Sequence, residues 1–283
     1  MRWPPQNRTR RAHRSGLGPT ARPPASRRAG RRRPLGLRAG ALAVLAVLAV
    51  GCSSAPQAVR RSGVPTPTTA PPRTPAVAAW TEVATLDGAV EVHVSPDASS
   101  PATLLPATWH GATLTLPVLD SVVGWLDVRL PGRPNGQTGW VASDQVSLAR
   151  TPYHLVVDLA TEHLELYDMG RLVLDAPAGI GTAQYPTPVG HFFVALLAQS
   201  PGPEWGPFVM VTSAHSDTIT DWEESGDALV AIHGPLGDDA QIGTTGAAVS
   251  HGCIRLHVSD LEQLRPVPVG TPVDVIAGQP PAV

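Results

Sequence analysis

A cysteine between a glycine and an isoleucine, close to a histidine, is the feature of this sequence best suited to chemistry. It lies in Ser250-His251-Gly252-Cys253-Ile254-Arg255, near the C-terminus of the 283 residues. Only the thiolate is reactive, and a free thiol has a pKa of about 8.5, so Cys253 needs a neighbouring imidazole to take its proton. His233 and His251 are the candidates. Gly252 would leave backbone amides open to a developing oxyanion, so the segment predicts attack on a carbonyl group.

Two other readings of these residues were weighed. Cysteine hydrolases with the Cys before the His would need His257, which the alternation of Ile254, Leu256 and Val258 places on the outer side of an expected strand. A zinc peptidase needs a defined set of ligands. His191, His215 and His233 are scattered, without such a spacing. The histidines therefore give no support to a zinc peptidase.

The elements that must position these groups are mostly strands. Alternating or continuous apolar runs end in turn formers such as Asp168-Met169-Gly170, which predicts a hairpin before and after that turn. We expect strands at residues 153–159, 164–167, 171–175, 190–196, 208–211, 228–233 and 273–276. A capping box predicts one short helix with Ser259 at its N-cap and Glu262 three residues later.

Three aromatic residues are candidates for contact with a substrate. Trp205 and Trp222 fall in the loop-rich stretch 198–227, which precedes the candidate histidine and could cover an acyl site. Tyr185 precedes Pro186 in a second loop. Packing within the loops is the other reading of all three side chains.

Two blocks of sequence resemble the L,D-transpeptidase catalytic domain. The first is Tyr185-Pro186-Thr187-Pro188-Val189-Gly190-His191-Phe192, and the second is His233-Gly234 followed by Ser250 to Arg255. The resemblance covers residues 153–276. It implies a β-sandwich-like domain that remodels bacterial peptidoglycan, releasing the terminal D-alanine of a tetrapeptide stem and passing the acyl group to an amine of another stem.

The resemblance also implies that no metal or organic cofactor is required, and it implies a role for each matching residue. Cys253 would be the nucleophile and His233 the general base and acid, oriented by the backbone carbonyl of Gly234. His251 and Gly252 would line the reacting side. The expected substrate-binding residues are Ser250, Arg255, Tyr185, Trp205 and Trp222. The other role considered for Ser250 is structural support, and that for Arg255 is positioning of the loop.

The first 51 residues read as an export signal. They hold twelve of the 21 basic residues and no Asp or Glu, and they end in a short apolar run before Cys52. Ala49-Val50-Gly51-Cys52 resembles a bacterial lipobox, which implies a lipid on Cys52 and a membrane-anchored protein facing the cell wall. The alternatives are an ordinary cleaved signal and an uncleaved single-span anchor.

The rest of the chain is acidic and divides into three parts. Residues 52–283 carry nine Arg against all 23 acidic residues, which argues against binding to nucleic acid. Residues 52–78 are rich in Pro, Thr and Ala, which predicts an extended linker. Residues 79–149 read as short strands, and Trp125–Pro131 with Gly139-Trp140-Val141 resembles a small bacterial SH3-like β-barrel. Residues 150–283 would be the catalytic domain.

The fold class predicted is therefore mainly β, with a sandwich-type catalytic domain and few short helices. The function predicted is a peptidoglycan L,D-transpeptidase whose partners are stem peptides and, through Cys52, a membrane. Two other functions stay open at this point: a wall-binding lipoprotein whose catalytic domain has decayed, and a Cys-dependent peptidoglycan hydrolase or carboxypeptidase.

Overall fold

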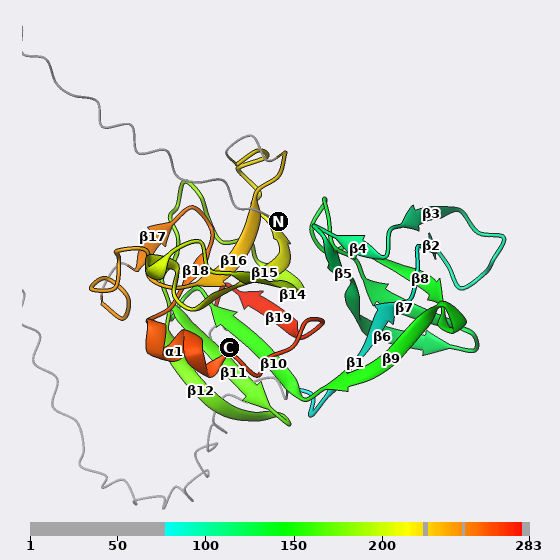
Figure 1. The fold of residues 1–283 in the computed structure, drawn as a ribbon, viewed down its shortest axis with the longest axis horizontal. Helices are drawn as coiled ribbons and strands as arrows, with labels where there is room; N and C mark the ends of the chain where they lie inside the picture. Colours follow the sequence, from blue (N-terminus) through cyan, green and yellow to red (C-terminus); the bar gives the residue numbers. More distant parts are fainter. Residues whose placement is uncertain (1–76, 223–225, 245–246, 279–283) are drawn as a thin grey trace, which may run out of the picture. The chain divides into compact units, whose positions relative to one another are not determined.

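The computed structural model describes residues 77–222, 226–244 and 247–278 (Figure 1). Strands dominate these residues, so the predicted mainly β fold class is confirmed. Expectations for residues 1–51, for Cys52 and for most of the 52–78 linker fall outside the described residues. No helix among the described residues is long and apolar enough to cross a membrane.

The first sheet has seven strands in the order β3-β2-β8-β7-β6-β1-β9. Its pairings are antiparallel throughout. The small β4–β5 hairpin and the 3₁₀ turn η1 (Ser143–Gln145) accompany it. Its strands are β1 (Thr81–Leu86), β2 (Val90–His93), β3 (Ala102–Leu105), β4 (Thr108–Trp109), β5 (Ala112–Thr113), β6 (Thr115–Val122), β7 (Trp125–Arg129), β8 (Thr138–Ala142) and β9 (Val146–Thr151). The resemblance of this part to an SH3-like barrel stays a prediction.

The second sheet has eight strands in the order β12-β11-β10-β19-β14-β15-β16-β18. It begins at Tyr153, two residues after the first sheet ends. Each strand expected in this part is present. The strands are β10 (Tyr153–Asp158), β11 (His163–Asp168), β12 (Arg171–Pro177), β14 (Gly190–Gln199), β15 (Phe208–His215), β16 (Leu229–His233), β18 (Ile254–Arg255) and β19 (Pro272–Ile276).

Three shorter elements complete the second part. Strands β13 (Ile180–Gly181) and β17 (Ala248–Ser250) pair in parallel beside the sheet, and η2 (Pro203–Trp205) is a 3₁₀ turn. Helix α1 (Val258–Gln263) packs near β12 (Figure 1). Its N-cap is His257, so the prediction of Ser259 as the cap was wrong. The expected strand through Val258 was also wrong, because the chain leaves β18 after Arg255 and both Asp260 and Leu261 donate their amides to His257 O.

Strand β14 faces two hydrophobic cores. Side chains alternate across a strand, and Phe192 and Val194 pack into the core of the second sheet. Phe193 and Ala195 point the other way and join the core of the first sheet, with Phe193 fully buried. One strand of the second sheet therefore completes the core of the first.

Candidate active site

The pairing of β16 with β18 sets the relation between the candidate nucleophile and its base. The two strands are parallel, with Ile232 opposite Ile254 and His233 opposite Arg255. Residues directly opposite share a face, and alternate residues along a strand share it too. His233, Arg255 and Cys253, which directly precedes β18, therefore lie on one face. Ile232 and Ile254 fill the core on the other.

His233 is buried and held in one tautomer. Its Nδ1 lies 2.7 Å from the carbonyl oxygen of Gly234, and the side chain is 1% exposed. A carbonyl only accepts, so Nδ1 carries the proton, and in the neutral ring Nε2 keeps a free lone pair. Burial lowers the pKa of His233 to about 4; the Gly234 hydrogen bond opposes this and the nearby charge of Arg255 adds to it. At neutral pH the ring is uncharged and able to accept a proton.

Cys253 is a protonated thiol in its resting state. Burial raises its pKa, while a backbone hydrogen bond with Ala231 and the charge of Arg255 oppose the rise. The thiol packs against an apolar cluster that contains Val211 and Ala231. In the described part of the chain, the thiol and the His233 ring are not hydrogen-bonded to each other. The pair is thus neutral, and the proton must move during attack rather than before it.

Ser250 and Gly252 shape the turn that presents Cys253. The Ser250 hydroxyl donates to Cys253 O at 2.6 Å and accepts the Gly252 amide at 3.0 Å. Gly252 has φ +117°, a conformation that side chains rarely adopt, so glycine is required here. The Gly252 amide already donates to Ser250, so it is not free for an oxyanion. The Cys253 amide has no acceptor among the described residues, and it is therefore the one that could donate to an oxyanion.

Thr187 ties the Tyr185 loop to this turn, and the sequence reasoning assigned it no role. Its buried hydroxyl donates to Gly252 O at 2.9 Å and accepts the Gly181 amide at 2.9 Å. The Thr-Pro pair in the first block of resemblance was the signal that pointed to it. The Thr187 hydroxyl thus holds the backbone of Gly252, one residue before Cys253.

Arg255 is engaged by the loop that follows His233. Its Nη1 is paired with Asp238, while its Nε is buried without a hydrogen-bond partner in the described residues. Its backbone exchanges two hydrogen bonds with Gly179, each of 2.8 Å. Of the two roles considered for Arg255, these contacts favour positioning the loop over binding a substrate carboxylate. Asp238 is a second residue that the sequence reasoning missed.

Tyr185, His251 and Trp222 form a group that we call the aromatic wall. The ring of His251 lies 4.8 Å from Tyr185 and 5.1 Å from Trp222, measured between ring centroids. His251 is exposed and Trp222 is 37% exposed, so the wall faces solvent. His251, the central member of the wall, stands two residues before Cys253 in the sequence.

Trp205 lies next to His233. Its ring centroid is 4.5 Å from that of His233, and its carbonyl accepts the Gly234 amide at 2.8 Å. A Cβ added to Gly234 would come within 2.7 Å of the Trp205 backbone. This close approach requires glycine after His233 and brings the Trp205 indole against the His233 imidazole.

Ten of the eleven predicted site residues are described, and the contacts above link each of them to the Cys253 turn or to His233; the eleventh, Cys52, is not described. His257, the alternative base, is paired instead with Asp239 at 2.7 Å. No group of three or more His, Cys, Asp or Glu side chains that could hold a metal occurs within the described residues.

The sequence of the second part matches a known family. Residues 152–275 match the model of the YkuD L,D-transpeptidase catalytic domain. The YkuD protein of Bacillus subtilis (strain 168) is 28% identical over 153 residues, which are 52% of this chain and 83% of that protein. The YkuD protein of Bacillus licheniformis is 31% identical over 125 residues, which are 44% of this chain and 66% of that protein.

Solved structures of the same type are also similar to the chain. The catalytic domain of the Enterococcus faecium L,D-transpeptidase is 24% identical, covering 44% of this chain and 96% of that one, with a TM-score of 0.33. An L,D-transpeptidase from Mycobacterium smegmatis is 18% identical, covering 70% and 99%, with a TM-score of 0.36. The family match and the YkuD relatives support an L,D-transpeptidase enzyme, with residues 152–275 similar to the YkuD catalytic domain.

Proposed function

We propose that this enzyme cross-links or edits peptidoglycan stems through an acyl-enzyme on Cys253. The observation that carries the proposal is the β16–β18 register, which sets the thiol and the His233 ring on one face of the sheet. The neutral ring, with Nδ1 committed to Gly234 O, offers Nε2 as the base. The substrate class comes from the family match.

In the first half-reaction, the Cys253 proton moves to His233 Nε2 while Sγ bonds to the carbonyl carbon before the terminal D-alanine. The negative charge that develops on the carbonyl oxygen is stabilised by the Cys253 amide. The carbon–nitrogen bond then breaks, and His233 returns its proton to the amine of the departing D-alanine. The product is a thioester on Cys253.

In the second half-reaction, an amine of another stem attacks the thioester carbon and gives a proton to His233. The carbon–sulfur bond breaks, and the thiol recovers its proton from the imidazole. The same neutral pair is restored, so the enzyme needs no external proton source over a cycle. The aromatic wall lies where either stem could pack its backbone or side chains.

The placement of the enzyme outside the cytoplasm is part of the proposal. The lipobox-like segment before Cys52 supports an anchored lipoprotein whose linker lets the catalytic domain reach the wall. Labelling of wild-type cells with an alkynyl fatty acid, compared with Cys52→Ala, tests this part alone. Label that persists in Cys52→Ala, or none in the wild type, would contradict lipidation.

The acyl acceptor is tested by alanine release. The purified full chain is mixed with a disaccharide-tetrapeptide, with and without an amine-bearing stem peptide. Alanine released together with a joined product supports transpeptidation. Alanine released at the same rate without a joined product would show that the enzyme is a carboxypeptidase and not a transpeptidase. Cys253→Ala should release no alanine with or without the acceptor.

A further inference from the structure

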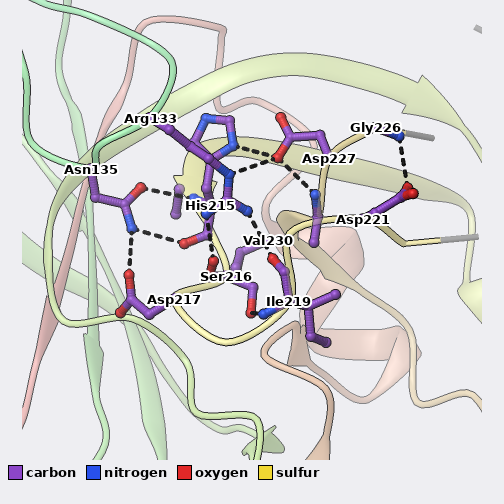
Figure 2. A network of polar contacts seen from close by, with 12 residues as sticks. Arg133, Asn135, His215, Ser216, Asp217, Ile219, Asp221, Gly226, Asp227 and Val230 are labelled. Atoms are coloured by element: carbon purple, nitrogen blue, oxygen red, sulfur yellow. Dashed lines mark hydrogen bonds and ion pairs between the residues drawn. The ribbon is translucent and has the colours of Figure 1, made fainter. Parts of the chain in front are cut away.

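A loop of the first sheet holds the segment that leads to the aromatic wall. Arg133, between β7 and β8, spreads its guanidinium over three acceptors of the second part (Figure 2). Nη1 donates to Ser216 O at 2.7 Å and Nη2 to Ile219 O at 2.9 Å. Nε donates to Asp227 Oδ1 at 3.3 Å. The planar fork therefore binds Ser216 and Ile219, which precede Trp222 in the chain, and Asp227, which follows it.

Asn135 adds a second clamp from the same loop. Its Nδ2 donates to His215 O at 2.8 Å, and its Oδ1 accepts the His215 amide at 2.9 Å. This pairing imitates a β-bridge at the point where β15 ends. Nδ2 also contacts Asp217 Oδ1 at 3.2 Å. Figure 2 shows the amide of Asn135 directed at both groups.

The two clamps meet at the pair of the buried His215 and the partly exposed Asp227. His215, 2% exposed, has Nδ1 2.8 Å from Asp227 Oδ1, the oxygen that also receives Arg133 Nε. The same oxygen accepts the Ala228 amide at 2.7 Å. Asp227 O accepts the amide of Trp222 at 2.8 Å. The path from Arg133 to Trp222 thus consists of one carboxylate and one backbone bond.

Trp109, in the β4–β5 hairpin that accompanies the first sheet, contacts the second part of the chain at another place. Its ring lies 6.4 Å from that of His215, at 82° to it. It also packs on the apolar cluster of Leu196, Val209, Val211 and Ala231 against which Cys253 packs. The part of the chain before Tyr153 therefore contacts the second part in two places that are separate in sequence. One is the loop that holds Arg133 and Asn135, and the other is the Trp109 ring.

We propose that Arg133 and Asn135 are positioning residues for substrate binding, acting through Trp222 on the aromatic wall. The inference rests on the proposed function of Cys253. The Cys253–His233 relation is set where β16 pairs with β18, at Ile232 and His233, whereas the clamp meets β15 and β16 at the opposite end, at His215 and Leu229. Loss of the clamp should therefore weaken binding of the acyl donor while the chemical step remains.

The kinetic test uses the full chain and D-alanine release from a disaccharide-tetrapeptide. Arg133→Ala and Asn135→Ala should each raise KM by about tenfold and leave kcat within about threefold. Trp222→Ala should do the same, and Arg133→Ala/Trp222→Ala should be no worse than Trp222→Ala alone, since both act through one side chain. Arg133→Lys should recover only part of the affinity, because an ammonium lacks the planar fork.

The matched control is Arg150→Ala, which removes an exposed arginine of the first sheet that pairs with Glu82 and covers Trp80. It should leave KM and kcat unchanged. All rates are measured well below the melting temperature of each variant. An unchanged KM in Arg133→Ala, a KM rise of the same size in Arg150→Ala, or fully additive effects in the double variant would overturn the proposal.

A second readout does not depend on turnover. In protein labelled with ¹³C-histidine, the His251 ring signal, assigned with His251→Gln, should move in Trp222→Ala because a ring current is lost. Arg133→Ala should move it in the same direction. A shift in Trp222→Ala without one in Arg133→Ala would overturn the positioning role. If the wild type released no alanine, the proposed function would fail. The His251 signal would still show whether Arg133 positions Trp222.

Discussion

His233 Nδ1 lies 2.7 Å from the carbonyl oxygen of the next residue, Gly234. A backbone carbonyl here does the orienting that a carboxylate does in a Ser-His-Asp triad. It adds no negative charge beside the ring, so burial leaves His233 with a pKa lowered to about 4. The His233 imidazole is thus neutral at physiological pH, and so is the Cys253 thiol, whose pKa burial raises.

The lowered pKa of His233 makes folding stability fall in acid. The unfolded ring has its ordinary pKa of 6.5 and binds a proton below that pH, while the folded ring stays neutral down to about 4. Stability from this group is complete above pH 6.5 and is lost towards pH 4, by about 3 kcal/mol in total. Urea unfolding at pH 7 and pH 5 should show a smaller loss in His233→Gln. An equal loss in both proteins would contradict the shift.

His233→Gln should also slow donor turnover by about 10²- to 10⁴-fold at pH 7, because the amide of Gln cannot take the thiol proton. The intact protein is measured by D-alanine release, with His257→Gln as the control. His257 pairs with Asp239 away from the thiol, so its loss should leave the rate within about twofold. A large loss in His257→Gln would restore the alternative with the reversed order of Cys and His.

Thr187→Val should destabilise the fold and misplace the nucleophile turn. It leaves Gly181 N and Gly252 O without their shared hydroxyl, at a cost of about 1–3 kcal/mol. Thr187→Ser keeps the hydroxyl and should retain most of the stability and activity. Denaturant midpoints and alanine release are measured on both. Equal behaviour of the Val and Ser variants would show that the hydroxyl bridge contributes little.

Gly234→Ala should disturb the site through packing alone. The added Cβ would come within 2.7 Å of Gly206 N and of the Trp205 backbone. Either Trp205 moves off His233 or the Gly234 carbonyl turns away from it, and both lower activity. Gly88→Ala is the control, because nothing lies within 4 Å of its added Cβ. The account fails here if Gly234→Ala keeps the alanine-release rate of Gly88→Ala.

Arg255→Gln should make Cys253 harder to ionise. The charge of Arg255 opposes the burial that raises the pKa of the thiol, so its removal leaves that pKa higher still. The rate of iodoacetamide alkylation, followed against pH, should therefore rise at a higher pH than in the wild type. Arg265→Gln, on a surface pair with Glu262, should not move the profile. A midpoint that is unchanged or lower in Arg255→Gln would contradict this role.

Local patterns in the sequence were enough to predict the strands of the second sheet and the residues around Cys253. Alternation and turn formers act within a few residues, and the Ser250–Arg255 segment carries its chemistry in one stretch. The bond from Thr187 to Gly252 spans 65 residues, and that from Arg133 to Ser216 spans 83. Such contacts depend on how segments far apart in the sequence pack together, and a local sequence pattern cannot predict that packing.

At the start of helix α1 a local sequence pattern gave the wrong boundary. Ser259 and Glu262 have the spacing of a capping box, yet the cap is His257, whose side chain makes no capping bond. The chain turns out of β18 after Arg255, and the buried Leu261 and Leu264 anchor the turn that follows. Packing against the core set the boundary and overrode the preference of serine for the cap position.

The most direct measurement is the intact mass of the full chain after mixing with a disaccharide-tetrapeptide. The account predicts an adduct equal to the stem fragment less one alanine, present in the wild type and absent in Cys253→Ala of unchanged fold. An adduct that persists in Cys253→Ala would place the acyl group elsewhere. A folded wild type that forms no adduct and releases no alanine would contradict acyl transfer through this thiol.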